Sequence, residues 1–311
     1  MAISTPGADT RIEPATSDLY ILTRVAELGT LSAAARERDV PVSHVSRAIT
    51  RLEKDYEVRL VNRSTHGLSI TPEGELFLAH ARRVVESLSD LSAELDTRSG
   101  SPTGLVRLSV SQVMGDAQIV PSLPELLAKY PGLRVDILAD DAMVDLTTQG
   151  IDLAVRTNVI VNDNLVARHV GEYGRALYAS PDYVARHGTP ASPEQLAQHR
   201  CVTHASSSIL NRWSFKSGRK RVDQIVQGFY RANNSAMLLA MVRQGIGIGR
   251  ITTAIAGPLC DAGELVPVLD EYRDPVRYPI YLVMLPDRHR LPKIKACGDH
   301  LATLYKRLKD Y

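Results

Sequence analysis

Two helical patterns separated by a proline lie between positions 31 and 63. Ser32 is the expected cap of the first helix, because its hydroxyl can accept from free backbone N–H groups, and it is followed by three alanines, which are strong helix formers. Pro41 then interrupts the pattern because it lacks an N–H group. Beyond position 43 the apolar residues recur three or four positions apart and therefore share one face of a helix; they are Val45, Ala48, Ile49, Leu52 and Tyr56. The pattern predicts two short helices joined by a tight turn.

The opposite face of the second predicted helix is polar and partly cationic. It carries Ser43, His44, Ser46, Arg47, Thr50 and Arg51. Short polar side chains can reach phosphates or base edges without much bulk, and arginine can form two hydrogen bonds to guanine. These features favour a DNA-reading helix-turn-helix. A solvated surface helix would carry a similar face, so this pattern alone does not separate the two interpretations.

A heptad pattern follows between positions 73 and 96. Its apolar residues alternate between spacings of four and three, and they are Phe77, Ala81, Val84, Leu88, Leu91 and Leu95. The pattern predicts a long helix that pairs with its copy in a homodimer. Such a dimer would present two reading helices to two half-sites of DNA. The alternative is one amphipathic helix that lies on its own domain.

Elsewhere the chain predicts a helix near the N-terminus and an alternation of strands and helices in the C-terminal two thirds. Ser17 and Asp18 are expected to cap the first helix, and Gly29 to end it. The segment 97–103 (TRSGSPT) is a short hinge with Ser, Gly and Pro and is the predicted domain boundary. Beyond it, predicted strands cover 105–110, 133–138, 152–155, 175–179, 200–203, 222–230, 246–248, 265–269 and 279–284, and predicted helices cover 119–129, 143–148, 235–243 and 292–308. This order favours a parallel α/β sheet.

Spaced motifs across the first 74 residues resemble the LysR-type transcriptional regulators. They are S-A-A-A at 32–35, V-S-R-A-I at 45–49, L-E at 52–53, V-R-L at 58–60 and I-T-P-E-G at 70–74. The chain departs from the family at Pro41-Val42, where a Ser-Pro pair is usual, so Ser43 is the expected cap of the second helix. Leu31 stands where the family often has Phe.

The resemblance implies a winged helix-turn-helix at 14–72, in which a two-stranded wing follows the reading helix, and a linker helix for dimerisation at 73–97. The expected DNA contacts are Ser32, Ser43, His44, Ser46, Arg47, Thr50, Arg51, Arg63, Thr65 and His66. Arg47 and Arg51 are expected on bases or phosphates, and Arg63 in the wing.

The C-terminal motifs resemble the effector-binding part of the same regulators. They include Y-P at 130–131, G-I-D-L-A-V-R at 150–156, L-Y-A-S-P at 177–181 and G-I-G-I at 245–248. The implied fold is α+β and α/β: a winged helix-turn-helix, a linker helix, and at 104–311 a two-lobed domain like that of periplasmic solute-binding proteins. The first lobe is expected at about 104–162 and 268–311, and the second at about 163–267.

A small-molecule effector is expected between the lobes, because ligands of such sheets bind at the carboxyl ends of strands and near helix N-termini. The candidate contacts are Ser111, Gln112, Thr157, Asn158, His204, Asn233, Asn234 and Ser235. Each of these residues could instead have a capping or turn role, since Ser, Thr and Asn commonly do so.

The overall composition is that of a globular protein, with 44% hydrophobic and 23% charged residues in a chain of 311 and a net charge of +2. The N-terminal sequence lacks an apolar signal segment, which predicts a cytoplasmic, nucleoid-associated protein without a membrane partner. The three cysteines, Cys201, Cys260 and Cys297, are widely spaced, which indicates reduced thiols, although a redox sensor would leave the same pattern.

No cofactor and no metal site are expected. Gly245, Gly247 and Gly249 lack the spacing of a dinucleotide-binding loop, and Cys201 with His204 has no further Cys or His at metal-ligand spacing. The expected partners are duplex operator DNA, a small-molecule effector, a homodimer or dimer of dimers, and RNA polymerase. The alternative is a small-molecule-binding or enzymatic α/β protein whose N-terminal module serves only for dimerisation.

Overall fold

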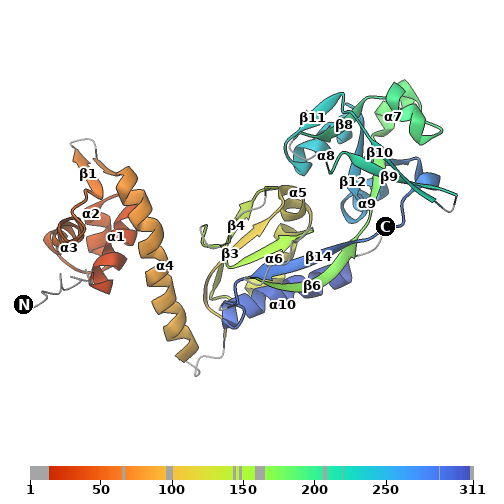
Figure 1. Ribbon diagram of the computed structural model, residues 1–311. Coiled ribbons are helices and arrows are strands. Elements are labelled where there is room, and N and C mark those ends of the chain that lie inside the picture. Colours follow the sequence, from red (N-terminus) through yellow and green to blue (C-terminus); the bar gives the residue numbers. More distant parts are fainter. Residues whose placement is uncertain are drawn as a thin grey trace, which may run out of the picture. The chain divides into compact units, whose positions relative to one another are not determined.

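The computed structural model of the chain divides into two compact units, residues 1–98 and 99–311. It describes residues 14–64, 67–95, 101–142, 145–146, 149–157, 165–205, 209–218, 220–286 and 288–308, and for 63, 64, 67, 90 and 93–95 it describes the backbone alone. Every structural statement below concerns these residues. The helices and strands of both units are labelled in Figure 1.

Helices and a two-stranded wing form the described part of the N-terminal unit (Figure 1). The elements are α1 (Thr16–Leu28), α2 (Leu31–Glu37), α3 (Val42–Asp55), β1 (Val61–Ser64), β2 (Gly67–Ile70) and α4 (Pro72–Leu95). Helix α1 packs against α2, α3 and α4, and its Leu22 and Val25 are buried with Val45, Ile49 and Leu52 of α3. The apolar face predicted for the second helix therefore forms the core of this unit.

The helix starts differ from those predicted. Thr30 caps α2 by accepting a hydrogen bond of 3.1 Å from the Ala33 N–H, so Ser32 is not the cap. Helix α3 begins after Pro41 without a side-chain cap, and Ser43 lies within its first turn. Helix α1 begins after Ala15, also without a side-chain cap. Its C-terminal end was predicted correctly, because Gly29 ends α1 in the left-handed conformation with φ of 74°.

The start of α4 explains the threonine and glycine of the I-T-P-E-G motif. The Thr71 hydroxyl accepts a hydrogen bond of 2.9 Å from the Gly74 N–H and donates one of 2.5 Å to the Arg59 carbonyl. A Cβ atom at Gly74 would lie 2.2 Å from the Leu60 carbonyl oxygen and 2.7 Å from a methyl group of Ile70. Glycine therefore allows α4 to lie directly against the base of the wing.

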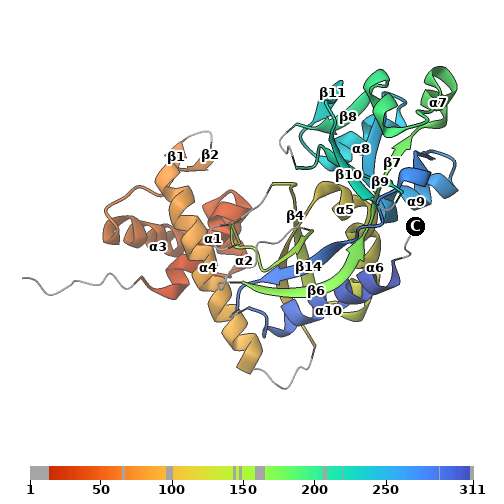
Figure 2. The same ribbon diagram turned by 45° about the vertical axis from the view of Figure 1, so that its right-hand side comes forward.

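The C-terminal unit contains two five-stranded sheets, which define its two lobes (Figures 1 and 2). The first lobe has the strand order β4 (Leu133–Ala139), β3 (Gly104–Val110), β5 (Leu153–Arg156), β14 (Tyr278–Met284) and β6 (Val166–Tyr173). The second has the order β11 (Tyr230–Ala232), β8 (Cys201–His204), β12 (Ile248–Thr252), β7 (Arg175–Ala179) and β13 (Val266–Val268). A separate hairpin pairs β9 (Arg212–Ser217) with β10 (Lys220–Ile225).

Helices cover both lobes. In the first lobe the chain runs from α5 (Gln112–Met114) through the π-helix η1 (Gly115–Ile119) into α6 (Val120–Lys129), and α10 (Pro292–Arg307) packs against β3, β6 and α6 (Figure 2). The second lobe contains α7 (Pro181–His187), η2 (Pro193–Gln198), α8 (Ser235–Arg243), α9 (Thr253–Asp261) and η3 (Asp270–Tyr272). No described helix is long and apolar enough to cross a membrane.

Three predictions about this unit need correction. Both sheets are mixed instead of parallel, since β14 is antiparallel to β5 and β6, and β7 is antiparallel to β12 and β13. Strand β6 pairs within the first lobe, so the second lobe begins near 174 and not at 163. The predicted strand at 222–230 is in fact divided between β10 and β11, which belong to different sheets. The predicted helix at 143–148 includes positions outside the described residues.

Candidate DNA interface and effector cleft

The polar face of α3 is exposed. Ser43, His44, Arg47 and Thr50 are exposed, and Ser46 is half-buried. The Arg47 Nε donates a hydrogen bond of 3.2 Å to the Ser43 carbonyl, and the Thr50 hydroxyl donates one of 3.0 Å to the Ser46 carbonyl. Both contacts stay within the helix, so the Arg47 guanidinium has no carboxylate partner among the described residues. Ser32 on α2 is exposed as well.

Arg51 lies on the same helix but has an intramolecular partner. Its Nε and Nη2 donate hydrogen bonds of 2.8 Å each to the two carboxylate oxygens of Asp18 on α1. The Asp18 side chain is 4% exposed and that of Arg51 is 51% exposed, so the pair joins the core of the unit to its surface. Sequence reasoning assigned Arg51 to DNA and Asp18 to a helix cap, because a contact between residues 33 positions apart leaves no periodic signal.

The wing is tied to the end of α3 by Glu53. Its Oε1 accepts hydrogen bonds of 2.9 Å from the Leu60 N–H and 3.2 Å from the Val61 N–H. The backbone of Arg63 lies in β1, while its side chain lies outside the described part of the structure, as do Thr65 and His66. The structure therefore locates the wing but not these three predicted contacts.

The apolar positions predicted as a dimer seam divide into two groups along α4. Ala81 is 2% exposed and Phe77 packs against the same core, where its ring meets that of Tyr56 at 4.8 Å. These two residues thus belong to the core of their own unit. By contrast, Val84, Leu88 and Leu91 are 45%, 41% and 50% exposed, and Leu95 has no described side chain. Leu76, 66% exposed, extends the apolar surface, and sequence reasoning did not include it.

A carboxylate from the first lobe contacts the second lobe directly. Asp141 Oδ2 accepts a hydrogen bond of 2.6 Å from the Ser235 N–H at the start of α8, and its Oδ1 accepts one of 3.2 Å from the Gln112 N–H at the start of α5. The His204 Nε2 lies 3.8 Å from Asp141 Oδ2. Asp141 thus lies between two helix N-termini, where a negative charge is favoured. Asp141 was not among the effector contacts predicted from the sequence.

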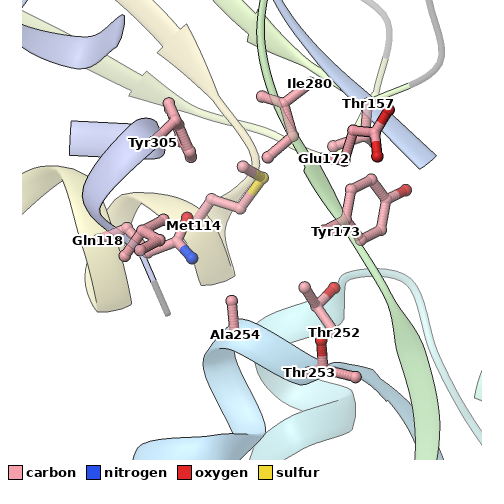
Figure 3. Close-up of a pocket in the computed structure, with 11 residues that line it drawn as sticks. Met114, Gln118, Thr157, Glu172, Tyr173, Thr252, Thr253, Ala254, Ile280 and Tyr305 are labelled. Carbon is pink, nitrogen blue, oxygen red and sulfur yellow. The ribbon is translucent and has the colours of Figure 1, made fainter. Parts of the chain in front are cut away.

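The predicted effector contacts are divided between two places. Gln112, His204 and Ser235 gather around Asp141, whereas Asn234 caps α8 by accepting a hydrogen bond of 2.8 Å from the Met237 N–H. Asn233 precedes that cap and is exposed, and Ser111 precedes α5 without a side-chain capping bond. Thr157 instead lines a separate pocket near the strands that join the lobes, called the hinge pocket below (Figure 3). Asn158 lies outside the described residues.

A half-buried arginine of the first lobe adds a positive charge near Asp140 and Asp141. Arg156, at the end of β5, donates a hydrogen bond of 2.7 Å to the Ser109 hydroxyl. Loss of solvation on burial lowers the pKa of Arg156, and the carboxylates of Asp140 and Asp141 act in the opposite direction. This region therefore combines a cation with carboxylates, a set of groups that can bind a polar small molecule.

The cysteines are poorly suited to thiol chemistry. Burial raises the pKa of Cys201 and of Cys297 to about 12, so neither forms a thiolate at neutral pH. Burial also raises the pKa of the half-buried Cys260. Across the described ranges, no cluster of three or more His, Cys, Asp or Glu residues could hold a metal ion.

Both units match one family of regulators. Residues 16–75 match the bacterial regulatory helix-turn-helix protein, lysR family, and residues 99–306 match the LysR substrate binding domain. The second match covers more than half of the chain.

Similar proteins span nearly the whole chain. The probable transcriptional regulator LtrA of Klebsiella pneumoniae is 29% identical over 287 residues, which cover 92% of this chain and 93% of LtrA. The transcriptional activator TtdR of Escherichia coli is 28% identical over 290 residues, covering 93% of each. The structure of CrgA, a LysR-type transcriptional regulator from Neisseria meningitidis, has a TM-score of 0.63 and 26% identity, covering 96% of this chain and all of CrgA. The chain therefore belongs to the LysR family of transcriptional regulators, which bind DNA and small-molecule effectors and form oligomers, and it is not an enzyme.

Proposed function

We propose that a homodimer of this chain contacts operator DNA through the exposed face of α3. The residues expected in the major groove are Ser43, His44, Ser46, Arg47 and Thr50, with Arg63 of the wing on the DNA backbone. The exposure of this face and the lack of a carboxylate partner for Arg47 support the assignment. Arg51 is expected to contribute through its bond to Asp18, which holds α1 against α3. A regulator of this kind acts at the nucleoid in the cytoplasm.

Dimerisation is proposed to use the exposed apolar surface of α4. Val84, Leu88 and Leu91 recur at heptad spacing and are exposed on α4, and Leu76 adds a further exposed apolar side chain nearer the start of the helix. An exposed stripe of this kind indicates a contact with another protein surface. A second copy of the same helix fits because a two-fold dimer matches two DNA half-sites. Pairing of dimers into tetramers and contact with RNA polymerase are further parts of the proposal.

Replacing Leu88 by glutamate should convert dimers into monomers. Each buried leucine contributes about 1.5–3 kcal/mol to an interface, and a two-fold axis brings two charges into the same seam. Sedimentation velocity of the full chain at micromolar concentration would measure the change. Ser89→Glu is the matched control, because Ser89 is also exposed but points to a different side of α4. A dimer that survives Leu88→Glu would exclude this seam.

Effector binding is proposed to act on the contact between Asp141 and the start of α8. The observation that carries this proposal is the Asp141 carboxylate, which accepts backbone hydrogen bonds from both lobes. An effector that enters the cleft changes the free energy of this contact, and hence the equilibrium between lobe arrangements. An anionic effector would have to displace Asp141, whereas a cationic or neutral one could bind beside it.

Asp141→Ala should separate the lobes without an effector. A hydrogen bond to a charged group contributes about 1.5–3 kcal/mol, so its loss should raise the population of separated lobes about 10- to 100-fold. Spin labels at the exposed positions Ala128 of α6 and Ala185 of α7 would report the distance between the lobes in the full chain. Asp140→Ala is the control, since within the described ranges the Asp140 carboxylate accepts a hydrogen bond only from the Ala142 N–H of its own turn. Identical distance distributions in the wild type and Asp141→Ala would contradict the proposal.

A further inference from the structure

A second site between the lobes, apart from the Asp141 cleft, is the hinge pocket (Figure 3). First-lobe residues Met114, Gln118, Ile280 and Tyr305 line it on one side, and the start of α9 in the second lobe lines it on the other. Its volume is about 40 Å³, which is room for a few small groups, and it is partly open to solvent.

Three buried polar atoms in the lining of this pocket have no hydrogen-bond partner among the residues that the structure describes. They are Gln118 Oε1, Thr253 Oγ1 and the Tyr305 hydroxyl, and the three residues are 6%, 0% and 5% exposed. They come from η1, α9 and α10, three elements far apart in the sequence. An unpaired buried polar group costs about 1–3 kcal/mol, so a protein rarely keeps several around one pocket unless a further molecule satisfies them.

Two of these side chains are held against the strand that crosses between the lobes. A Cβ atom at Gly171 of β6 would lie 3.3 Å from Tyr305 Cβ, and one at Gly174 would lie 3.3 Å from Thr253 Oγ1. The Thr253 N–H also donates a hydrogen bond of 3.0 Å to the Gly174 carbonyl. Close packing therefore fixes both residues before any ligand arrives, which lowers the entropy cost of binding.

The chemistry of the lining favours an uncharged ligand. No Lys, Arg or His lines the pocket within the described ranges, and the exposed Glu172 at its edge would repel an anion. Burial raises the pKa of Tyr305 well above its usual value, so its hydroxyl remains a neutral donor. The Gln118 carbonyl oxygen is an acceptor, while Met114 and Ile280 provide apolar contacts.

We propose that the hinge pocket binds a small neutral molecule that carries both a hydrogen-bond donor and an acceptor on a short apolar chain, of the class of short primary amides. The amide N–H would donate to Gln118, and the amide oxygen would accept from Thr253 and Tyr305. Because residues of both lobes line the pocket, such a molecule would bind one arrangement of the lobes more tightly than others. It would therefore act as a second effector of the regulator.

The test compares propionamide with propionate, which has nearly the same shape but is an anion. Saturation-transfer NMR titrations of the full chain should give a Kd of about 1 mM for propionamide, as expected for five heavy atoms, and no saturable binding of propionate. Thr253→Val and Tyr305→Phe should each weaken propionamide binding about 3- to 10-fold. Thr303→Val is the control on α10, because the Thr303 hydroxyl bonds to its own helix at Asp299.

Thermal unfolding of the same variants distinguishes a pocket that binds a ligand from a pocket that is permanently filled by water. Tyr305→Phe should raise, and not lower, the melting temperature of the free protein, since it removes a hydroxyl that is buried without a partner among the described residues. The proposal would be overturned if propionate bound more tightly than propionamide. It would also be overturned if the wild type and both variants bound propionamide equally well. So would a lowered melting temperature of Tyr305→Phe together with no amide binding. None of these outcomes depends on the Asp141 contact.

Discussion

Replacing Arg47 by alanine is expected to reduce the affinity for operator DNA by about 1–3 kcal/mol, or about 5- to 150-fold, without a change in stability. The Arg47 side chain is exposed, and its hydrogen bond ends on the carbonyl of its own helix, so the fold does not depend on it. Gel-shift titrations at several salt concentrations, together with circular dichroism, would measure both quantities. If Arg47 contacts a phosphate, the variant should show a slope of log binding constant against log salt concentration that is smaller by about one. If Arg47 contacts a base, the variant should instead have a weaker preference for the operator sequence.

Arg51→Ala is the matched comparison on the same helix. It should lower the melting temperature, because it leaves the carboxylate of Asp18 buried without its partner, which costs about 1–3 kcal/mol or more. Any loss of DNA affinity should then follow the loss of folded protein. If Arg47→Ala bound the operator as tightly as the wild type, the assignment of the α3 face to the major groove would be wrong.

Gly74→Ala is expected to have the largest effect on the stability of the N-terminal unit. The added methyl group would lie 2.2 Å from the Leu60 carbonyl oxygen, and a backbone atom cannot move aside as easily as a flexible side chain. Overpacking of this kind costs about 1–3 kcal/mol, and α4 would have to shift away from the wing. Thermal unfolding followed by circular dichroism would measure the change.

Gly298→Ala provides the control for that measurement. Gly298 lies inside α10 of the other unit, and the nearest atom to its added Cβ is a methyl group of Leu282 at 3.8 Å. Alanine favours a helix over glycine, so this variant should be neutral or stabilised by about 0.4–1 kcal/mol. Gly74→Ala melting at the wild-type temperature would mean that α4 can adjust its position freely.

The helix-turn-helix could be predicted from the sequence because its signals are local. The three- and four-residue spacing of Val45, Ala48, Ile49 and Leu52 marks the buried face of α3, and all four are buried. Likewise, α8 has the predicted bounds, since Asn234 and the apolar run after it form a local pattern. The positions of helix caps were less predictable, because Thr30, Ser32 and Ser43 are chemically similar candidates that lie close together.

The contacts that join distant segments could not be predicted in this way. Asp141 and Ser235 are 94 positions apart, and no periodicity relates them. Strand β6 was missed because Arg168, His169 and Glu172 interrupt its apolar alternation, and its exposed positions reflect its place at the edge of the sheet. The hinge pocket depends on three unpaired side chains from separate elements, and each of them alone has the character of an ordinary core residue.

The bond network of Glu53 has a consequence for the operators that this protein can recognise. Because one carboxylate at the end of α3 holds the first two backbone amides leading into the wing, the helix proposed to read the major groove and the wing should move as one rigid body. If both contact DNA as proposed, the distance between the bases at the helix and the flanking phosphates at the wing is constant within each half-site. Natural operators should accordingly vary in the number of base pairs between half-sites, while the layout inside each half-site stays the same.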